Sequence, residues 1–333
     1  MTVKVFENRK GFLFFTLLIL AGPLVIKSNY IISVMILIAI YGVLSIGMEI
    51  LMGQAGLFSL AHPTWFGLGA YISGILTVRN MFPPIVSILV AGIIVAIVAY
   101  IIGAPILRLK GFYLACATFA IIIIAQVAAS QLTDLTGGPE GLVGVPALSV
   151  AGFKFKTDLQ FYYLSWIFCL ACYLFCSNLI SSRMGRAIKS FHDSEVASGS
   201  VGINVPSYKL QVFVLTSAMA SIVGGIFCFY LRFVVPESFG FLLLLELLMM
   251  TILGGLEDIR GALIGTISVL WLKEFLNNYL RKVFPSMSSG FDTIFFGILI
   301  IVVLIFMPRG LVGWMDRLRN LWEKQFHRTS GEI

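Results

Sequence analysis

Charged residues are scarce in this chain of 333 residues. Asp, Glu, Lys and Arg make up 12% of it, against about 25% in an average soluble domain, and hydrophobic residues reach 59%. A water-soluble fold has too little interior to hide that much apolar surface, and no polar interval is long enough to fold separately. The composition therefore predicts one all-α membrane domain at 11–314, between a cytoplasmic N-terminus at 1–10 and a cytoplasmic basic tail at 315–333.

Catalytic and metal-binding motifs are also absent from the sequence. It has no GxxxxGK[ST] phosphate loop, no HExxH and no GxSxG, so ATP hydrolysis by a phosphate loop of its own is excluded. The three histidines are far apart, and the five cysteines lie inside apolar stretches, where a thiol packs as a small hydrophobe. We expect no catalytic residue, no metal and no bound cofactor. An intramembrane enzyme stays an alternative that no motif supports.

Long apolar runs dominate what is present. A membrane helix needs about 20 apolar residues, and this length identifies ten candidate segments. They are 11–26, 30–51, 55–78, 84–106, 112–131, 160–181, 211–234, 240–256, 261–280 and 290–308. The third contains several glycines and Pro63, which predict a broken helix; such a break is tolerated where backbone is buried in protein or lines a cavity.

Lysine and arginine positions test the count of ten, because cytoplasmic loops carry an excess of both. With ten crossings and the N-terminus inside, fifteen of them face the cytoplasm, seven face outward and Lys273 lies within a helix. Both termini are therefore predicted to be cytoplasmic. The interval 132–159 falls outside and predicts turns and irregular backbone, whereas 182–210 falls inside and predicts a short helix between Gly185 and Gly199.

Ionisable residues at membrane depth are candidates for a transport pathway, since an unpaired charge there is costly. The candidates are Glu49, His62, Glu246 and the adjacent Lys273 and Glu274. Each also has a structural interpretation: snorkelling for Glu49, a helix-end hydrogen bond for His62 and an interhelical contact for the others. The residues alone leave these alternatives open.

Several glycine-rich blocks, in this order and spacing, resemble one known family. The blocks are GQAGLFSLAHPTWFGLGAY at 53–71, LRLKGFYLACATFA at 107–120, TGGPEGLVGVP at 136–146, GRAIKSFHDSEVASGSVGIN at 185–204, GGLEDIRGALIGT at 254–266 and PRGL at 308–311. The chain from about 30 to 314 is similar to the permease subunits of ABC importers for branched-chain amino acids, specifically the larger, LivM-type subunit. It departs from the family pattern at Ala61, His192, Glu257, Asp258 and Arg260.

The resemblance implies a type II-like importer permease and assigns site residues. A coupling helix that docks on an ATPase subunit would comprise Arg186, Lys189, Phe191, His192, Asp193 and Glu195, with Phe191 as apolar anchor. The pathway and gate would comprise Gly53, Gly56, Ser59, His62, Gly67, Gly69, Tyr71, Gly137, Gly138, Glu140 and Gly141.

The resemblance also implies partners and a location. These are a second homologous permease subunit, two ATPase subunits that bind ATP and Mg, an external solute-binding protein, and the bacterial inner membrane. The implied solute is a branched-chain amino acid or similar small polar solute, with urea, amides or small aromatic acids as alternatives. A stand-alone secondary transporter is a further alternative, and Glu246 would be its best ion-coupling residue.

Overall fold

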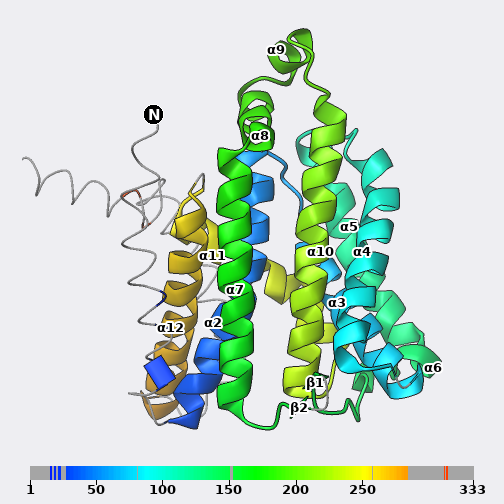
Figure 1. Ribbon diagram of the computed structural model, residues 1–333, viewed down its shortest axis with the longest axis vertical. Coiled ribbons are helices and arrows are strands. Elements are labelled where there is room, and N and C mark those ends of the chain that lie inside the picture. Colours follow the sequence, from blue (N-terminus) through cyan, green and yellow to red (C-terminus); the bar gives the residue numbers. More distant parts are fainter. Residues whose placement is uncertain are drawn as a thin grey trace, which may run out of the picture.

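The computed structural model describes residues 28–80, 82–150, 153–256 and 258–283, together with the isolated positions 16, 19, 22, 23, 311 and 313. Within these residues the chain is a bundle of helices with one small hairpin (Figure 1). The elements are α2 (Asn29–Glu49), the π-helix η1 (Ile50–Gln54), α3 (His62–Asn80), α4 (Pro84–Ile106), α5 (Phe112–Gln131), α6 (Thr133–Thr136), η2 (Gly138–Glu140), β1 (Ser149–Val150), β2 (Phe153–Lys154), α7 (Asp158–Ser181), α8 (Arg183–Asp193), α9 (Glu195–Ser200), α10 (Val205–Leu231), η3 (Pro236–Phe239), α11 (Phe241–Gly254) and α12 (Ile259–Val283).

Six membrane-spanning candidates satisfy both length and hydropathy among the described residues. They are Asn29–Gln54, Pro84–Ile106, Phe112–Gln131, Asp158–Ser181, Val205–Leu231 and Pro236–Gly254. The chain is thus an all-α, multi-pass membrane protein. Eight of the ten predicted segments coincide with described helices, and the bounds of α4 and α5 are as predicted. The predicted segments 11–26 and 290–308 lie outside the described residues, apart from four isolated positions in the first.

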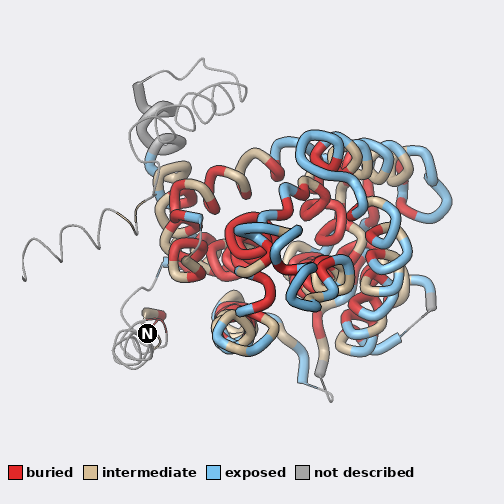
Figure 2. The backbone as a smooth tube through the Cα atoms, turned by 90° about the horizontal axis from the view of Figure 1, so that it is seen from above, coloured by how far each residue is buried: buried red, intermediate tan, exposed pale blue. Residues whose placement is uncertain are grey.

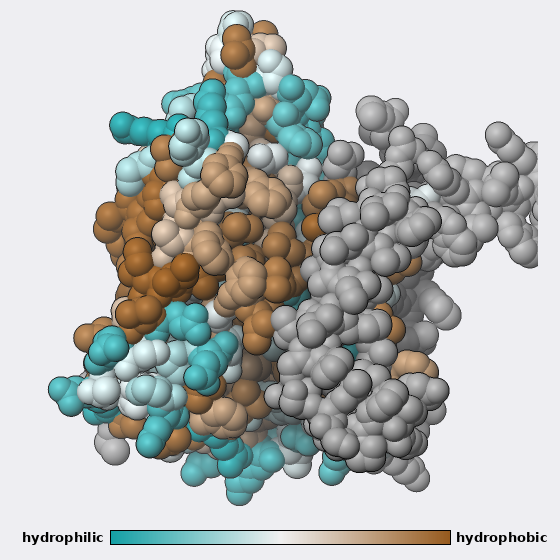
Figure 3. All heavy atoms as spheres, turned by 180° about the vertical axis from the view of Figure 1, so that it is seen from behind, coloured by the Kyte–Doolittle hydropathy of each residue, from teal (hydrophilic) through white to brown (hydrophobic). Residues whose placement is uncertain are grey.

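The helices run side by side, so the bundle has two distinct ends. One carries α8 and α9, and the other carries the β1–β2 hairpin (Figure 1); we name them the α8 end and the hairpin end. Seen along the bundle, buried backbone gathers at the centre and exposed backbone at the periphery (Figure 2). From behind, a hydrophobic band separates polar surfaces at the two ends (Figure 3), as expected for a protein surrounded by lipid.

The centre of the bundle is the packing of α10 against α3 and α4. Glycine permits it: a Cβ on Gly69 would lie 2.2 Å from the carbonyl oxygen of Ser221, and one on Gly224 would lie 2.1 Å from that of Phe66. Backbones this close need small residues at the crossing, a common device between membrane helices. Gly69 therefore serves helix packing.

Two carboxylates at membrane depth have partners on other helices. Lys273 of α12 donates to Glu246 of α11, and Tyr30 of α2 donates to Glu274. These contacts join α11 and α2 to α12, which supports the interhelical interpretation of Glu246. An ion-coupling role for Glu246 in a stand-alone transporter loses its main argument, because a charge held by a lysine is satisfied in place.

Two intervals differ from their predicted structure. The segment 55–61 is not helical, so α3 begins at His62 and not near 55 as predicted; Gly56 has a φ of 62°, and Pro63 occupies the first turn, where proline starts helices. The interval 132–159 is more regular than predicted, because it contains α6, η2 and an antiparallel hairpin that pairs Ser149 with Lys154.

Candidate functional site

The predicted site residues fall into two groups at different heights of the bundle. Residues 55–61, which we name the re-entry loop, lie between η1 and α3 and face the α8 end. Tyr71 and the glycines of 137–141 lie toward the hairpin end. The structure therefore separates the predicted pathway residues into two regions, and α3 connects them.

The re-entry loop runs past the end of α2 and then turns back into the bundle. A Cβ on Gly47 would lie 2.7 Å from Nε2 of His62, so the start of α3 lies beside the middle of α2's last two turns. The His62 ring is buried, and Thr216 of α10 also lies close to Gly47, 3.6 Å from the position of that Cβ. In the first turn of α3, Pro63 has no N–H, and the Thr64 N–H donates to the Ala61 carbonyl oxygen over 3.0 Å.

The loop contacts α8 and α5. At its far point, a Cβ on Gly56 would lie 2.5 Å from Cδ2 of His192. Further along, the Leu60 N–H donates to Oγ1 of Thr118 on α5, over 3.0 Å. Two predicted groups of residues, one around Gly56 and one on α8, are thereby in direct contact.

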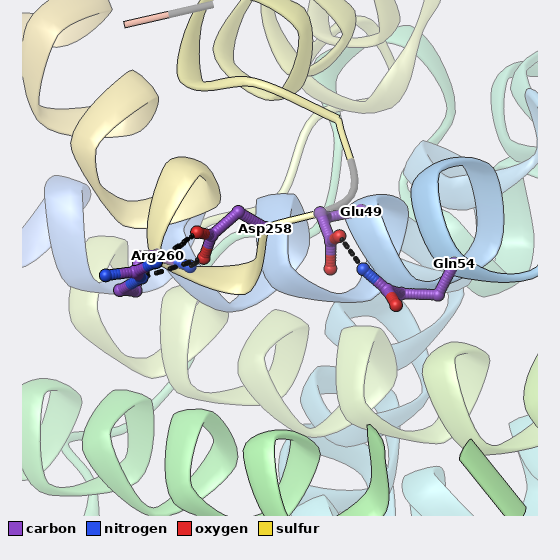
Figure 4. Close-up of polar contacts among 4 residues, drawn as sticks. All are labelled: Glu49, Gln54, Asp258 and Arg260. Atoms are coloured by element: carbon purple, nitrogen blue, oxygen red, sulfur yellow. Dashed lines mark hydrogen bonds and ion pairs between the residues drawn. The ribbon is translucent and has the colours of Figure 1, made fainter. Parts of the chain in front are cut away.

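Glu49 precedes the π-helix η1 and Gln54 is its last residue, directly before the re-entry loop. The Gln54 amide donates to Oε1 of Glu49 over 2.8 Å, and both side chains are buried (Figure 4). Gly53 is buried within the same turn. π-Helical turns are rare and occur often at functional sites. Glu49 therefore has a hydrogen-bond partner inside the bundle and does not snorkel to the surface.

Asp258 and Arg260 form a second polar pair, at the start of α12 (Figure 4). Asp258 accepts from the Arg260 backbone N–H over 2.9 Å, and the guanidinium donates to both carboxylate oxygens. This departure from the family pattern therefore caps a helix. The neighbouring Glu257 lies outside the described residues.

A small cavity lies between α3, α5 and η3. Its volume is about 40 Å³, enough for a water molecule but not for an amino acid. The lining residues are Thr64, Gly67, Leu68, Tyr71, Ala125, Gln126, Ala129, Pro236 and Phe239. The hydroxyl groups of Thr64 and of Ser59 nearby in sequence are buried without a hydrogen-bond partner among the described residues. The cavity is therefore a small space lined by a buried hydroxyl, that of Thr64, without a partner among the described residues.

Phe239 closes this cavity beside Gly67. A Cβ on Gly67 would lie 2.7 Å from Cγ of the Phe239 ring, which also packs on Phe66 and Tyr71. The predicted site residues do not include Thr64, Gln126 or Phe239. Gln126 could have been identified from the sequence, because it is an amide within the apolar run IIIIAQVAA.

At the hairpin end, the predicted glycine-rich loop is tied to the connection between α10 and α11. Leu142 and Val234 exchange two backbone hydrogen bonds, of 2.8 and 3.0 Å, and the Tyr71 hydroxyl donates to the Val234 carbonyl oxygen over 3.4 Å. Gly141 has a φ of 78°, and its Cβ would lie 2.1 Å from the same carbonyl. Gly137 and Gly138 also have positive φ, whereas Glu140 is exposed.

The amphipathic helix α8 has one buried and one exposed face. Gly185, Ala187, Ile188 and Phe191 are buried, and the exposed positions are Arg183, Arg186, Lys189, His192 and Asp193. Phe191 is 2% exposed and belongs to this chain's own core. This corrects the predicted role of Phe191: it fixes α8 to the bundle and is not available to anchor another protein.

Glu195 also has a different setting from the one predicted. It is the first residue of α9, a separate helix, because Ser194 ends α8 and caps α9. Its carboxylate accepts from Lys209, a lysine that is 6% exposed, and lies 3.5 Å from Nζ of Lys110. Partial burial raises the pKa of Glu195, but the hydrogen bond and charge of Lys209, with a contribution from Lys110, outweigh it and lower the pKa.

Replacing Glu195 with glutamine is expected to destabilise the α9–α10 contact in a pH-dependent way. Because the folded-state pKa is depressed, the stabilisation is present above the unfolded pKa and is lost as pH falls through the folded value. Thermal unfolding of Glu195→Gln and the parent chain between pH 3.5 and 7 should show midpoints that converge at the acid end. A difference that stays constant with pH would contradict the ion pair.

The comparisons with known proteins agree with this architecture. The family model described as "Branched-chain amino acid transport system / permease component" matches residues 30–306. The chain belongs to this family. Its match extends from the start of α2 to beyond α12, so the broken helix and the α8 segment both lie within the family region.

Several curated permeases are similar to the chain over most of its length. The high-affinity branched-chain amino acid permease LivM of Escherichia coli K12 is 25% identical over 296 residues, 82% of this chain and 68% of LivM. LivH of the same strain is 27% identical over 290 residues, 82% of this chain and 91% of LivH. A probable LivM of Methanocaldococcus jannaschii is 21% identical and covers 80% of this chain and 83% of its own. No solved structure matches.

Proposed function

We propose that this chain is a non-catalytic, LivM-like permease subunit that forms half of the translocation pathway of an ATP-driven importer. Family membership and the named relatives support a branched-chain amino acid as solute, and favour it over the amides and aromatic acids that the resemblance left open. The partners in this proposal are a second permease, two ATPase subunits that bind ATP and Mg, and an external solute-binding protein. The α8 end and both termini face the cytoplasm of the bacterial inner membrane.

One observation supports this mechanism most directly: His192 of α8 lies against Gly56 of the re-entry loop. The buried face of α8 is fixed to the bundle, and its exposed polar face, with Arg186 and Lys189, is free to meet a polar groove on another protein. A displacement of α8 would therefore be transmitted through Gly56 to the loop that leads into α3.

The other end of that path is the small cavity beside α3. The re-entry loop is bonded to α5 through Thr118, and α3 and α5 both line the cavity. Movement of the loop would change the spacing of these two helices, which must separate before a space of about 40 Å³ could admit an amino acid. We infer that the cavity marks the closed pathway, with Tyr71 and Gly141 as parts of its outer closure.

Helix α5 supplies a surface for the second permease. It is the least buried of the six spans, and Ile123, Ile124 and Val127 are exposed on it. Because α5 also lines the cavity, a partner packed on this surface would complete the wall of the pathway.

Reversing both α8 charges, Arg186→Glu with Lys189→Glu, is expected to lower ATP-driven uptake at least about tenfold. Two charge reversals in a polar interface introduce repulsion that costs several kcal/mol, while both side chains are exposed and leave the fold intact. The measurement is uptake of radiolabelled leucine into proteoliposomes that contain all proposed subunits and the binding protein.

The matched control reverses two exposed lysines at the hairpin end, Lys154→Glu with Lys156→Glu, which changes net charge equally. With this control variant, ATP hydrolysis by the partner subunits should still drive leucine uptake. Equal losses in both variants would contradict α8 as the coupling element. Uptake by the chain alone, without ATPase subunits, would support the stand-alone transporter instead.

A further inference from the structure

A large groove lies at the α8 end, and no residue of α8 lines it. Its volume is about 1190 Å³ and it opens to one side, whereas typical small-molecule pockets enclose about 300 to 1,000 Å³. The C-terminal half of α4 and the N-terminal half of α10 form its walls, and α9 covers its end. None of the predicted pathway residues lines it, so it is separate from the proposed translocation site.

The walls of the groove are mostly apolar, apart from Ser207 and Gln211 of α10, which are hydrogen-bonded to each other. Tyr100 and Ala104 line it from α4, and Leu210, Val214 and Ala218 line it from α10. From 204 to 218 the α10 wall extends about 20 Å, at about 1.5 Å per helical residue. One leaflet of the hydrocarbon core is about 15 Å thick, so the groove is long enough to accompany an acyl chain through a leaflet.

The rim of the groove is basic. Arg108, Lys110 and Lys209 line it together with one carboxylate, that of Glu195. Glu195 is shared between the two lysines, while the Arg108 side chain is exposed and makes no hydrogen bond or ion pair to any described residue. The rim therefore carries three positive charges and one negative charge, and this net positive charge suits a phosphate group.

We propose that this groove binds an anionic phospholipid, with an acyl chain between α4 and α10 and the phosphate at Arg108 and Lys110. The apolar walls fit a lipid better than a soluble metabolite, and basic pockets between membrane helices are known to bind lipid head groups. Both walls lie on helices that are long and apolar enough to span the membrane, which places much of the groove beside lipid. The bound lipid would brace α9 against α4 and so steady the segment that follows α8.

The test compares dioleoyl phosphatidylglycerol with dioleoyl phosphatidylcholine, two lipids with the same acyl chains. Binding to the purified full-length chain is measured by native mass spectrometry, and stabilisation by the thermal unfolding midpoint. We expect phosphatidylglycerol to bind at least about tenfold more tightly, as two surface basic residues imply. The double variant Arg108→Gln, Lys110→Gln should reduce this preference to that of phosphatidylcholine.

Two controls make the result specific. Lys154→Gln with Lys156→Gln removes two positive charges at the hairpin end and should keep the preference. Ala104→Trp fills the groove and should weaken both lipids, whereas Ile97→Trp, on an exposed position of α4 outside the groove, should not.

Three outcomes would overturn the proposal. They are equal binding of the two lipids by the parent chain, equal losses in a variant and its control, and stabilisation by inorganic phosphate that matches that by phosphatidylglycerol. A photocrosslinker at Val214 that captures a protein subunit and no lipid would likewise assign the groove to a protein partner.

Discussion

Replacing Gly69 with alanine is expected to destabilise the bundle by about 3 kcal/mol or more. The new methyl carbon would lie 2.2 Å from the Ser221 carbonyl oxygen and 2.4 Å from its Cα. These are backbone atoms of α10, so α3 and α10 must move apart, and overpacking of this kind costs about 1 to 3 kcal/mol, occasionally more. The measurement is unfolding of the purified chain in a titration with sodium dodecyl sulfate.

The matched control is Gly199→Ala in α9, where a Cβ would meet no atom within 4 Å. Alanine favours helix over glycine by about 1 kcal/mol, so this variant should be unchanged or slightly more stable. If Gly69→Ala were as stable as Gly199→Ala, the close approach of α3 and α10 would be wrong, and a lining role for Gly69 would regain support.

Replacing Phe191 with alanine is expected to reduce stability by about 3 to 5 kcal/mol, the usual cost of truncating a buried phenylalanine. Its side chain is among the largest that are fully buried in the chain. The same titration measures the loss, and ATPase coupling is measured in proteoliposomes with the partner subunits.

Lys189→Ala, on the exposed face of the same helix, separates the two roles of α8. It should leave stability within about 0.5 kcal/mol, as surface substitutions do, and it should weaken coupling. A stable Phe191→Ala variant with lost coupling would restore Phe191 as a docking anchor and contradict its burial in this chain.

Local sequence signals predicted the helices that depend on local properties. The bounds of α4 and α5 follow from uninterrupted apolar runs that start after Pro83 and Gly111, because run length and helix breakers are local properties. The start of α3 was misplaced, because an apolar run continues through the re-entry loop. The glycines and Pro63 predicted a break in this segment, but the contact of His62 with Gly47 was needed to show that the chain turns back into the bundle there.

The candidate site was predicted less completely, because its roles depend on partners distant in sequence. The apolar positions of α8 predicted a helix with one polar face. They did not show whether Phe191 is buried in this chain or against a partner protein. The membrane-depth charges were identified, but Glu246 meets Lys273 only when α11 packs on α12. Gln126 was missed because its neighbours in the cavity, Thr64 and Phe239, lie on other elements.

The sequence alone determined that this chain spans the membrane as a helical bundle, because the hydrophobic length of a segment is set by consecutive residues. The glycine-rich blocks of the sequence, in their order and spacing, also identified its family. Tertiary structure alone decided which glycines pack helices and which form turns, which charges are neutralised, and that α8 contacts the re-entry loop. Each of these depends on distances between segments far apart in the chain, and only the packing of the helices sets those distances.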